Sequence, residues 1–392
     1  MKRLIQYLSL NHIGVLELLF AFYCILSGYS WGVVKGNILF LLIMSVFAYL
    51  RKKKNNIHLN ELKWLMAFVA IHEFVVAIAI DAPGYMINNT ISALVSCFLI
   101  FPIVKAIRIE KLAGAINLVA IISIVGIVYH YLIIRNGGTV TPIPIPFLGG
   151  VDSASRLYEE GSRPTSFYWE PAAFVTYMLV PLFLSLRERK YIWSSIIIAS
   201  MFLSTSTTGI TMSLLMLVCY VFTQDVKMKY KAMIVTIACA FVWMLFSTDL
   251  FSAGLDKMAE TDIESTSRTV NGPAMVFNMP TLHLITGMPA ANPFDYYMSG
   301  GFKASEIVIK DNTIYCSTIW LVLAKYGIIG TLLFLWLYIK PLKTTREILP
   351  YIIVLFASMF FQSFTIGTSG FVFQLIFVYV FVYSYRKQQI HI

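Results

Sequence analysis

Charged residues are scarce in this chain of 392 residues. Asp, Glu, Lys and Arg make up 13% of the sequence, whereas 58% of it is hydrophobic and the mean hydropathy is +0.75. Soluble domains carry about 25% charged residues, so a soluble fold of this sequence would leave a large apolar surface in water. The composition therefore argues against a soluble protein and predicts one that is solvated by lipid.

The sequence also lacks a cysteine pattern typical of a metal site and a basic pattern typical of nucleic-acid binding. The five cysteines form no CxxC pair and no cluster of possible metal ligands, and all lie in or beside apolar stretches. We interpret them as small core residues. The net charge of +10 is not accompanied by a basic stripe interleaved with aromatic residues, so we predict no nucleic-acid partner.

Twelve apolar runs are present, each close to the ~20 residues that a helix needs to cross ~30 Å of hydrocarbon. They lie at about 13–28, 32–50, 62–80, 91–105, 112–134, 171–186, 191–204, 209–223, 232–248, 320–339, 348–364 and 371–385. These runs predict an all-α polytopic membrane protein of about 12 transmembrane helices in one bundle, with residues 1–392 as a single integral membrane domain.

Lys and Arg follow every even-numbered run, beginning with the sequence RKKK at 51–54. Because cytoplasmic segments retain Lys and Arg, this pattern predicts that both the N- and C-termini are cytoplasmic. Two long segments then lie outside, at 135–170 and 249–319. Both exceed the ~12–15 residues of an ordinary connection, and we expect any chemistry to occur there. The second is expected to contain a short helix around 266–279.

The sequence RPTSFYWEP at 163–171 is the densest group of candidate functional residues. Pro171 suits the first turn of a helix and Glu170 its N-terminal cap, which is the simpler interpretation. In the functional interpretation, Arg163, Glu170 and the aromatic residues between them lie at the membrane surface. A lipid-linked, phosphate-bearing sugar would present its head group there.

This stretch resembles the R-x-x-G-x-x-x-E-P pattern of the O-antigen polymerase and O-antigen ligase superfamily, bacterial membrane enzymes that assemble surface polysaccharide. Ser166 replaces the glycine of the pattern. The sequence STSTTG at 204–209 is similar to the Ser/Thr-rich hairpin that precedes a helix in this family.

Two further patterns are similar to the same family. Arg268, followed by Pro280 and Gly287, resembles the arginine and P-x-(x)n-G pattern of the second large loop, and KYGIIG at 325–330 resembles a G-x-x-G helix start. Ligases of the family typically carry a histidine where this chain has Cys316, so the resemblance favours a polymerase over a ligase.

The resemblance implies a membrane glycosyltransferase at the outer face of the bacterial inner (cytoplasmic) membrane. It would polymerise lipid-linked oligosaccharide repeat units by moving the growing chain from undecaprenyl diphosphate to a new lipid-linked repeat. Its partners would be undecaprenyl-diphosphate-linked oligosaccharide and membrane lipid, and a chain-length regulator protein is compatible with this role. The alternatives are an O-antigen ligase and a flippase or transporter of the same lipid-linked sugars, although transporters usually keep their external loops short.

A departing diphosphate requires fixed positive charge where no metal supplies it. Arg163 and Arg268, with Arg156 as a third candidate, would bind the diphosphate, because a guanidinium pairs with phosphate in bidentate fashion. The simpler interpretation of Arg156 is a solvated ion pair with Glu159 or Glu160.

The acceptor hydroxyl requires a general base, for which we choose Glu170 and Asp311, with His283 as a further external candidate. A helix cap is the commoner role of Asp311 in its local sequence. Asp262 and Glu264 form an acidic pair that could bind a metal, but a solvated acidic loop explains them more simply. We therefore predict no metal and no cofactor.

Glu17, His72 and Glu73 lie inside predicted spans. Ionisable groups are costly in lipid, so these side chains are expected to face the interior of the bundle. For Glu73 we favour a hydrogen bond to a hydroxyl or amide of a neighbouring helix over a proton pathway.

Overall fold

The computed structural model confirms that the chain is all-α. It describes residues 13–31, 34–51, 57–79, 83–149, 163–224, 267–309 and 312–390, with a few positions between 227 and 236. Within these residues there are fourteen α-helices and almost no strands.

The chain divides into two compact units, each built from separate stretches of sequence. The first unit consists of Met1–Arg51, Ala106–Glu260 and Glu347–Leu355. The second unit consists of Lys52–Lys105, Thr261–Arg346 and Phe356–Ile392. The single integral membrane domain expected from the sequence stays a prediction.

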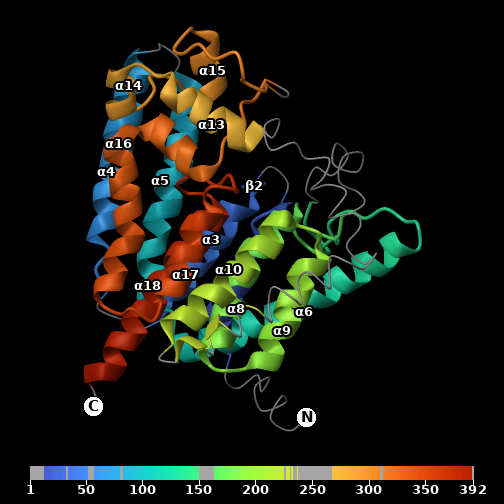
Figure 1. Ribbon diagram of the computed structural model, residues 1–392. Helices are drawn as coiled ribbons and strands as arrows, with labels where there is room; N and C mark the ends of the chain where they lie inside the picture. The colour runs from blue at the N-terminus through green and yellow to red at the C-terminus, as the bar shows by residue number, and fades with distance from the viewer. Residues whose placement is uncertain are drawn as a thin grey trace. The chain divides into compact units, whose positions relative to one another are not determined.

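The first unit contains a group of three mutually packed helices joined by short links, α8, α9 and α10 (Figure 1). Its elements are α2 (Val15–Leu26), the antiparallel pair β1 (Ser30–Trp31) and β2 (Val34–Lys35), α3 (Gly36–Leu50), α6 (Ile109–Arg135), α8 (Pro171–Arg187), α9 (Tyr191–Leu203) and α10 (Thr207–Thr223). Helix α17 (Leu349–Ser358) begins in this unit. Helix α6 packs against α2, α8 and α9.

In the second unit, α16 packs against α4, α13 and α14 (Figure 1). The elements are α4 (Asn60–Ala79), α5 (Pro83–Ala106), α13 (Ser267–Phe277), α14 (Thr281–Thr286), α15 (Pro293–Met298), α16 (Thr318–Ile339), the 3-10 helix η3 (Lys340–Lys343) and α18 (Ser369–Ile390). Helix α13 confirms the short helix expected around 266–279.

Helices occupy eleven of the twelve predicted runs, and the run at 232–248 lies largely outside the described residues. The prediction for 348–364 is too long, because α17 ends at Ser358. Beyond that end, the Gln362 carbonyl accepts hydrogen bonds from both the backbone N–H and the hydroxyl of Thr318, at 2.7 and 2.8 Å. The N–H of Phe364 donates to the same hydroxyl at 2.9 Å. These backbone groups therefore pair with Thr318 and do not extend the helix.

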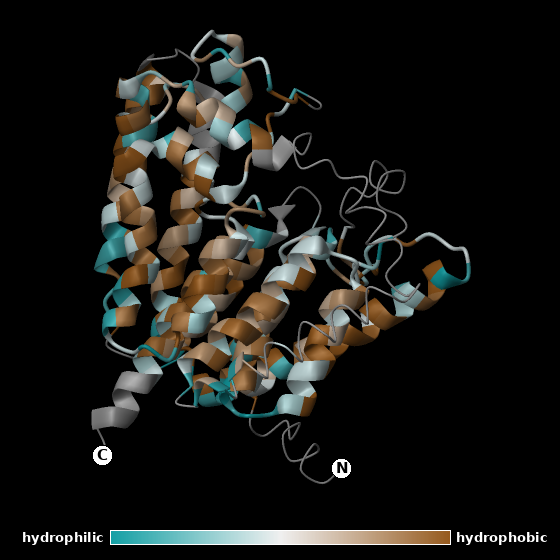
Figure 2. Cartoon of the chain, viewed as in Figure 1, coloured by the Kyte–Doolittle hydropathy of each residue, from teal (hydrophilic) through white to brown (hydrophobic). Residues whose placement is uncertain are grey.

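Two helical segments among the described residues, Ile109–Arg135 and Thr318–Lys343, are long and apolar enough to cross a membrane. Eight shorter apolar helical stretches of 10–17 residues are also present among the described residues, including Thr90–Ala106 of α5 and Ser369–Ser384 of α18. Figure 2 shows hydrophobic residues predominating along the helices of both units and hydrophilic residues gathering near helix ends and connections.

The carboxylates expected to face the interior are buried. Glu17 is fully buried and lies 2.7 Å from Arg51 Nη1, and Glu73 is buried and lies 2.9 Å from Lys325 Nζ. A buried carboxylate requires such a partner to offset the loss of water. The sequence interpretation predicted the interior position of Glu73 but expected a hydroxyl or amide partner, whereas the partner found is Lys325.

Candidate functional site

The segment from Arg163 to Glu170 is attached to α6 through a histidine. His130 is buried near the end of α6, and its Nδ1 accepts hydrogen bonds from the backbone N–H groups of Thr165 and Ser166, both at 3.2 Å. An imidazole nitrogen that accepts hydrogen bonds carries no proton, so this arrangement holds the ring in the tautomer protonated at Nε2.

Ser166 lies where the turn packs against α6 most closely. Its backbone is left-handed, with φ of 57°, a conformation that costs a non-glycine residue about 1–2 kcal/mol. A Cβ atom added to Gly126 of α6 would lie only 2.1 Å from Ser166 Oγ. The turn therefore requires both an unusual backbone conformation at Ser166 and a glycine on the helix beneath it.

Two tyrosine hydroxyls hold the same segment from other sides. The hydroxyl of Tyr29 lies 2.7 Å from the carbonyl oxygen of Ile143 and 3.0 Å from that of Phe167. The Tyr168 hydroxyl lies 3.1 Å from that of Ser123. Burial raises the pKa of both tyrosines, so their hydroxyls stay protonated and able to donate.

Arg163 connects this segment to the link between α9 and α10. Its Nη2 donates a hydrogen bond to the carbonyl oxygen of Thr205 at 3.3 Å. Thr205 has a left-handed backbone with φ of 51°, and Ser206 caps α10 by accepting from the N–H of Gly209 at 3.3 Å. Two segments singled out from the sequence, 163–171 and 204–209, are thus in contact.

Three hydroxyls of these two segments, those of Thr165, Ser166 and Thr205, are buried without a hydrogen-bond partner in the part of the chain that the structure describes. Both α8 and α10 begin at this end of the group, because α9 runs back between them. Helix N-termini carry partial positive charge. A guanidinium, three hydroxyls and two helix N-termini together suit an anion with several oxygen atoms. We call this the Arg163 site.

Glu170 occupies the expected cap position of α8, and Pro171 begins the helix. Its carboxylate makes no capping hydrogen bond. Of the aromatic residues expected at the surface, Trp169 is exposed, but Tyr168 is buried and packs against Phe174 and Tyr177. Tyr168 therefore belongs to the core of the unit and not to its surface.

The other predicted site residues are less fully described. Arg268 is the second residue of α13, and Arg156 and Asp311 lie outside the described residues. Asp262 and Glu264 lie outside them as well. A joint role of Arg156, Arg163 and Arg268, and the role of Asp311 as a base, stay predictions.

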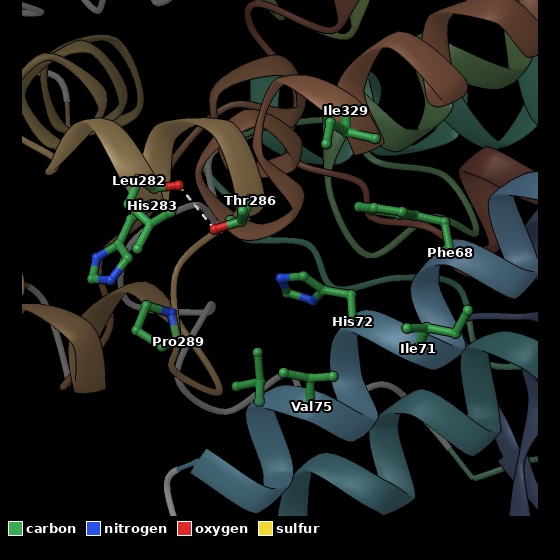
Figure 3. A pocket seen from close by; sticks show the side chains of 11 residues that line it. Phe68, Ile71, His72, Val75, Leu282, His283, Thr286, Pro289 and Ile329 are labelled. Carbon is green, nitrogen blue, oxygen red and sulfur yellow. Dashed lines mark hydrogen bonds between the residues drawn. The ribbon is translucent and has the colours of Figure 1, made fainter.

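The second unit contains a pocket of about 410 Å³ formed by α4, α14 and α16. Its lining residues are Phe68, Ile71, His72, Val75, Val76, Leu282, His283, Thr286, Gly287, Pro289 and Ile329. Figure 3 shows the side chains of α4 on one side of the pocket and those of α14 with Pro289 on the other, with the His72 ring directed between them. We call it the α4–α14 pocket.

Two glycines bring the backbone of the second loop against a kink in α16. Gly327 is non-helical, with φ of 65°, and a Cβ atom there would lie 2.3 Å from the carbonyl oxygen of Ile285. A Cβ atom on Gly287, with φ of 100°, would lie 2.3 Å from the carbonyl oxygen of Lys325. The Pro280–Gly287 pattern and the KYGIIG sequence are therefore in contact, as the wall of the pocket.

His283 was the one histidine among the candidate bases, and it lines this pocket. Its Nδ1 lies 2.6 Å from the hydroxyl of Tyr296, a buried residue of α15. Burial raises the pKa of Tyr296, so its hydroxyl stays protonated, and the tautomer of His283 decides which of the two groups donates. Within the described residues, no group of three or more His, Cys, Asp or Glu side chains could hold a metal ion.

Sequence interpretation missed two residues: His130, which holds the segment from Arg163 to Glu170, and Lys325, which pairs with Glu73. Both lie within or beside apolar runs, and an ionisable residue in such a run is itself a signal of function or of a buried partner. That signal identifies the residue but not its partner. The pairing of His130 with backbone N–H groups 35 and 36 residues away requires the fold.

The chain was compared with known proteins. No protein-family model matches it, and neither does any curated protein sequence.

Proposed function

We propose that this chain is a polymerase of lipid-linked oligosaccharide repeat units, with about twelve helices crossing the bacterial inner membrane and both termini in the cytoplasm. It transfers the growing chain from undecaprenyl diphosphate to a new lipid-linked repeat. The membrane location is supported by the two helices of membrane-spanning length and by the many shorter apolar helices.

The observation that carries the proposal is the contact between Arg163 and Thr205. It joins two segments 42 residues apart, each of which resembles a pattern of the same superfamily. The resulting Arg163 site supplies positive charge and hydroxyl groups, which a lipid diphosphate requires. Positive charge that is already in position stabilises a diphosphate as it leaves.

The backbone at Ser166 gives further support. The family pattern carries glycine at this position, and the left-handed conformation found here, with φ of 57°, is one that glycine adopts without steric cost. The same turn therefore accounts for both the glycine of the family and the strained serine of this chain.

In the proposed reaction, a hydroxyl of the acceptor sugar attacks the anomeric carbon of the donor chain. The bond from that carbon to the diphosphate oxygen breaks, the diphosphate departs with the electron pair, and the hydroxyl proton passes to a base. Arg163 is the residue proposed to bind the diphosphate, and the sequence offers Arg268 and Arg156 as further candidates for this role. Glu170, at the start of α8 in the same segment as Arg163, is the proposed base, with Asp311 as the second candidate.

The test is a polymerisation assay with purified lipid-linked repeats. Arg163→Ala is expected to lower the rate by about 100-fold or more, because a positioned charge is lost from the transition state. Arg163→Lys is expected to restore only part of the rate, since an ammonium lacks the planar fork. Arg135→Ala, which removes an exposed arginine at the end of α6, is the matched control and should keep the wild-type rate. Full activity of Arg163→Ala would end the proposal.

A deletion strain separates the alternatives through its surface glycan. A glycan of single repeat units supports the polymerase. Loss of all extracytoplasmic chains would indicate a flippase, and an intact but unattached polymer would indicate a ligase.

A further inference from the structure

The first of the two long external segments carries an exposed apolar tip that the proposed reaction does not use. We propose that Phe147, at this tip, and the neighbouring Trp31 insert into the outer leaflet of the membrane and anchor the segment at the lipid surface. The inference rests on the membrane location proposed above but not on the transfer reaction.

Phe147 occupies a strained position in a turn. The N–H of Leu148 donates to the carbonyl oxygen of Ile145 at 3.2 Å, and Phe147, the third residue of this turn, has φ of 68°. Glycine or asparagine usually occupies such a position, and a bulky residue there is an outlier. The Phe147 side chain is nevertheless 98% exposed. Backbone strain of this kind is retained mostly at functional sites, and here it directs an aromatic ring away from the rest of the chain.

The residues around Phe147 offer no polar side chain. The sequence from 142 to 148 is PIPIPFL, and Pro144 and Pro146 are exposed together with the ring. A sugar that stacked on Phe147 would find no side-chain partner for its hydroxyl groups among these seven residues, whereas an acyl chain requires none. An external connection in water is normally polar. The composition therefore favours lipid over glycan as the partner of the tip.

Backbone hydrogen bonds place the tip beside the link between α2 and α3. The N–H of Gly149 donates to the carbonyl oxygen of Ser30 at 2.7 Å, and the N–H of Ser30 donates to that of Gly149 at 3.2 Å. Helix α2 ends at Leu26 and α3 begins at Gly36, so this link is close to the ends of two apolar helices. Trp31, next to Ser30, is 66% exposed. Tryptophan is enriched where helices that cross a membrane leave the lipid.

The same segment is bonded to the residues of the Arg163 site. The N–H of Ile143 donates to the carbonyl oxygen of Ser166 at 2.9 Å, and the Tyr29 hydroxyl is within hydrogen-bond distance of the Ile143 and Phe167 carbonyls. The alternating prolines at 142, 144 and 146 favour an extended backbone. At ~3.1 Å per residue, the four steps from Ile143 to Phe147 span about 12 Å. An anchored Phe147 therefore keeps segment 163–171 near the head groups, where a lipid-linked diphosphate lies.

Spin labels on the full-length protein in proteoliposomes test the insertion. Phe147→Cys and Thr139→Cys are made in a protein whose native cysteines are replaced by serine, and each is labelled with a nitroxide. The label at 147 is expected to collide more with oxygen, which concentrates in lipid, than with a water-soluble nickel chelate.

The label at 139 is the matched control. Thr139 is exposed in the same segment, just after α6, whose 27 residues extend about 40 Å and so reach beyond ~30 Å of hydrocarbon. This label should collide more with the nickel chelate than with oxygen. The same preference for nickel at both positions would overturn the proposal.

Brominated phospholipids, which quench tryptophan on contact, test the native side chains. The emission of Trp31 is the difference between each protein and the same protein with Trp31→Phe, and it is expected to be quenched in proteoliposomes. Phe147→Asn suits the left-handed turn but removes the apolar ring, so it should lessen the quenching, whereas Phe147→Leu should keep it. Unquenched Trp31 in the wild type, or equal quenching in Phe147→Asn and the wild type, would overturn the anchor.

Other partners of the tip give different results, each of which would overturn the proposal. A soluble repeat oligosaccharide that immobilises the label at 147, with nickel still the more frequent collider, would indicate a glycan contact. Dipolar broadening between labels on two chains, again with nickel preferred, would indicate a second copy. A protein that inserts Phe147 but does not polymerise keeps this inference and loses the proposed function, and one that polymerises with position 147 in water does the reverse.

Discussion

Individual residues in and around the segment 163–171 make hydrogen bonds to the backbone that hold the path of the chain. His130 accepts two backbone N–H groups, Arg163 donates to the carbonyl oxygen of Thr205, and Tyr29 reaches two backbone carbonyls. Backbone groups buried without a partner are costly, so each of these side chains stabilises a particular path of the chain. Substitutions here are expected to change the conformation of the turn first and the chemistry of the site second.

Ser166 offers a test of backbone strain. Ser166→Gly is expected to raise the free energy of unfolding by about 0.5–1 kcal/mol, because glycine adopts the left-handed conformation without strain. Ser166→Val should lower it by about 2 kcal/mol or more, since a β-branched residue is strained at this φ and crowds Gly126. Thermal unfolding of the purified variants in detergent measures both, and a stabilised Ser166→Val would contradict the assignment of the turn.

His130 is expected to act through its unprotonated Nδ1. His130→Leu removes the acceptor for two buried N–H groups and should cost about 2–4 kcal/mol of stability. His130→Asn places an amide oxygen near the position of Nδ1 and should recover at least half of that loss. Unfolding temperatures of the two variants compare them directly. Equal losses would show that the hydrogen bonds to His130 do not stabilise the turn.

Helix α16 has two roles: it packs against other helices, and its kink makes room for the backbone of a loop. Its first half packs against α13 and α14, and the kink at Gly327 admits the backbone of Ile285 and Gly287. The 3.6-residue pattern of the sequence does not reveal this kink, because both halves of the helix are apolar. The same reasoning applies to α17, whose predicted length was wrong because the hydrogen bonds of Thr318 replaced those of a continuing helix.

Gly327→Ala tests the close contact at the kink. The added methyl group would meet the Ile285 carbonyl oxygen at 2.3 Å, and its φ of 65° is strained for alanine, so we expect a loss of about 2–4 kcal/mol. Gly300→Ala is the matched control, because Gly300 also has a positive φ but open space around it, and should lose only about 1 kcal/mol. The two unfolding temperatures give the contribution of the contact alone, and equal shifts would exclude a tight approach at Gly327.

At the scale of the whole molecule, each of the two units contains a buried carboxylate that is paired with a cation. Glu17 is paired with Arg51 in the first unit, and Glu73 is paired with Lys325 in the second. Because these pairs link residues far apart in sequence, loss of one partner leaves a buried charge that destabilises the whole unit.

The proposed topology predicts which side of the membrane each connection faces. Ser299→Cys, in the second external loop, should react with a membrane-impermeant maleimide in intact cells, whereas Thr344→Cys, among the basic residues after α16, should react only after permeabilisation. Both positions are exposed, so access is decided by the membrane. The native cysteines are replaced by serine in both variants. Labelling of position 344 in intact cells would reverse or invalidate the orientation.

Composition and apolar periodicity determined the all-α fold class. Each residue's preference for water or for an apolar environment can be read from its own position in the sequence. Composition and periodicity predicted the all-α fold, eleven of the described helices, the cap position of Glu170 and the interior position of Glu17 and Glu73. The membrane crossing and the transfer reaction remain predictions from the same local patterns.

The tertiary structure alone decided which residues meet. The bond of Arg163 to Thr205, the two bonds to His130 and the contact of Gly287 with Gly327 join segments between 35 and 42 residues apart. Lys325 and Glu73 lie on different helices. The apolar pattern of a helix shows which face is buried but not which neighbour covers it. Such pairs therefore cannot be identified from the apolar pattern of one sequence. Only the packing of the helices brings these groups within hydrogen-bond distance.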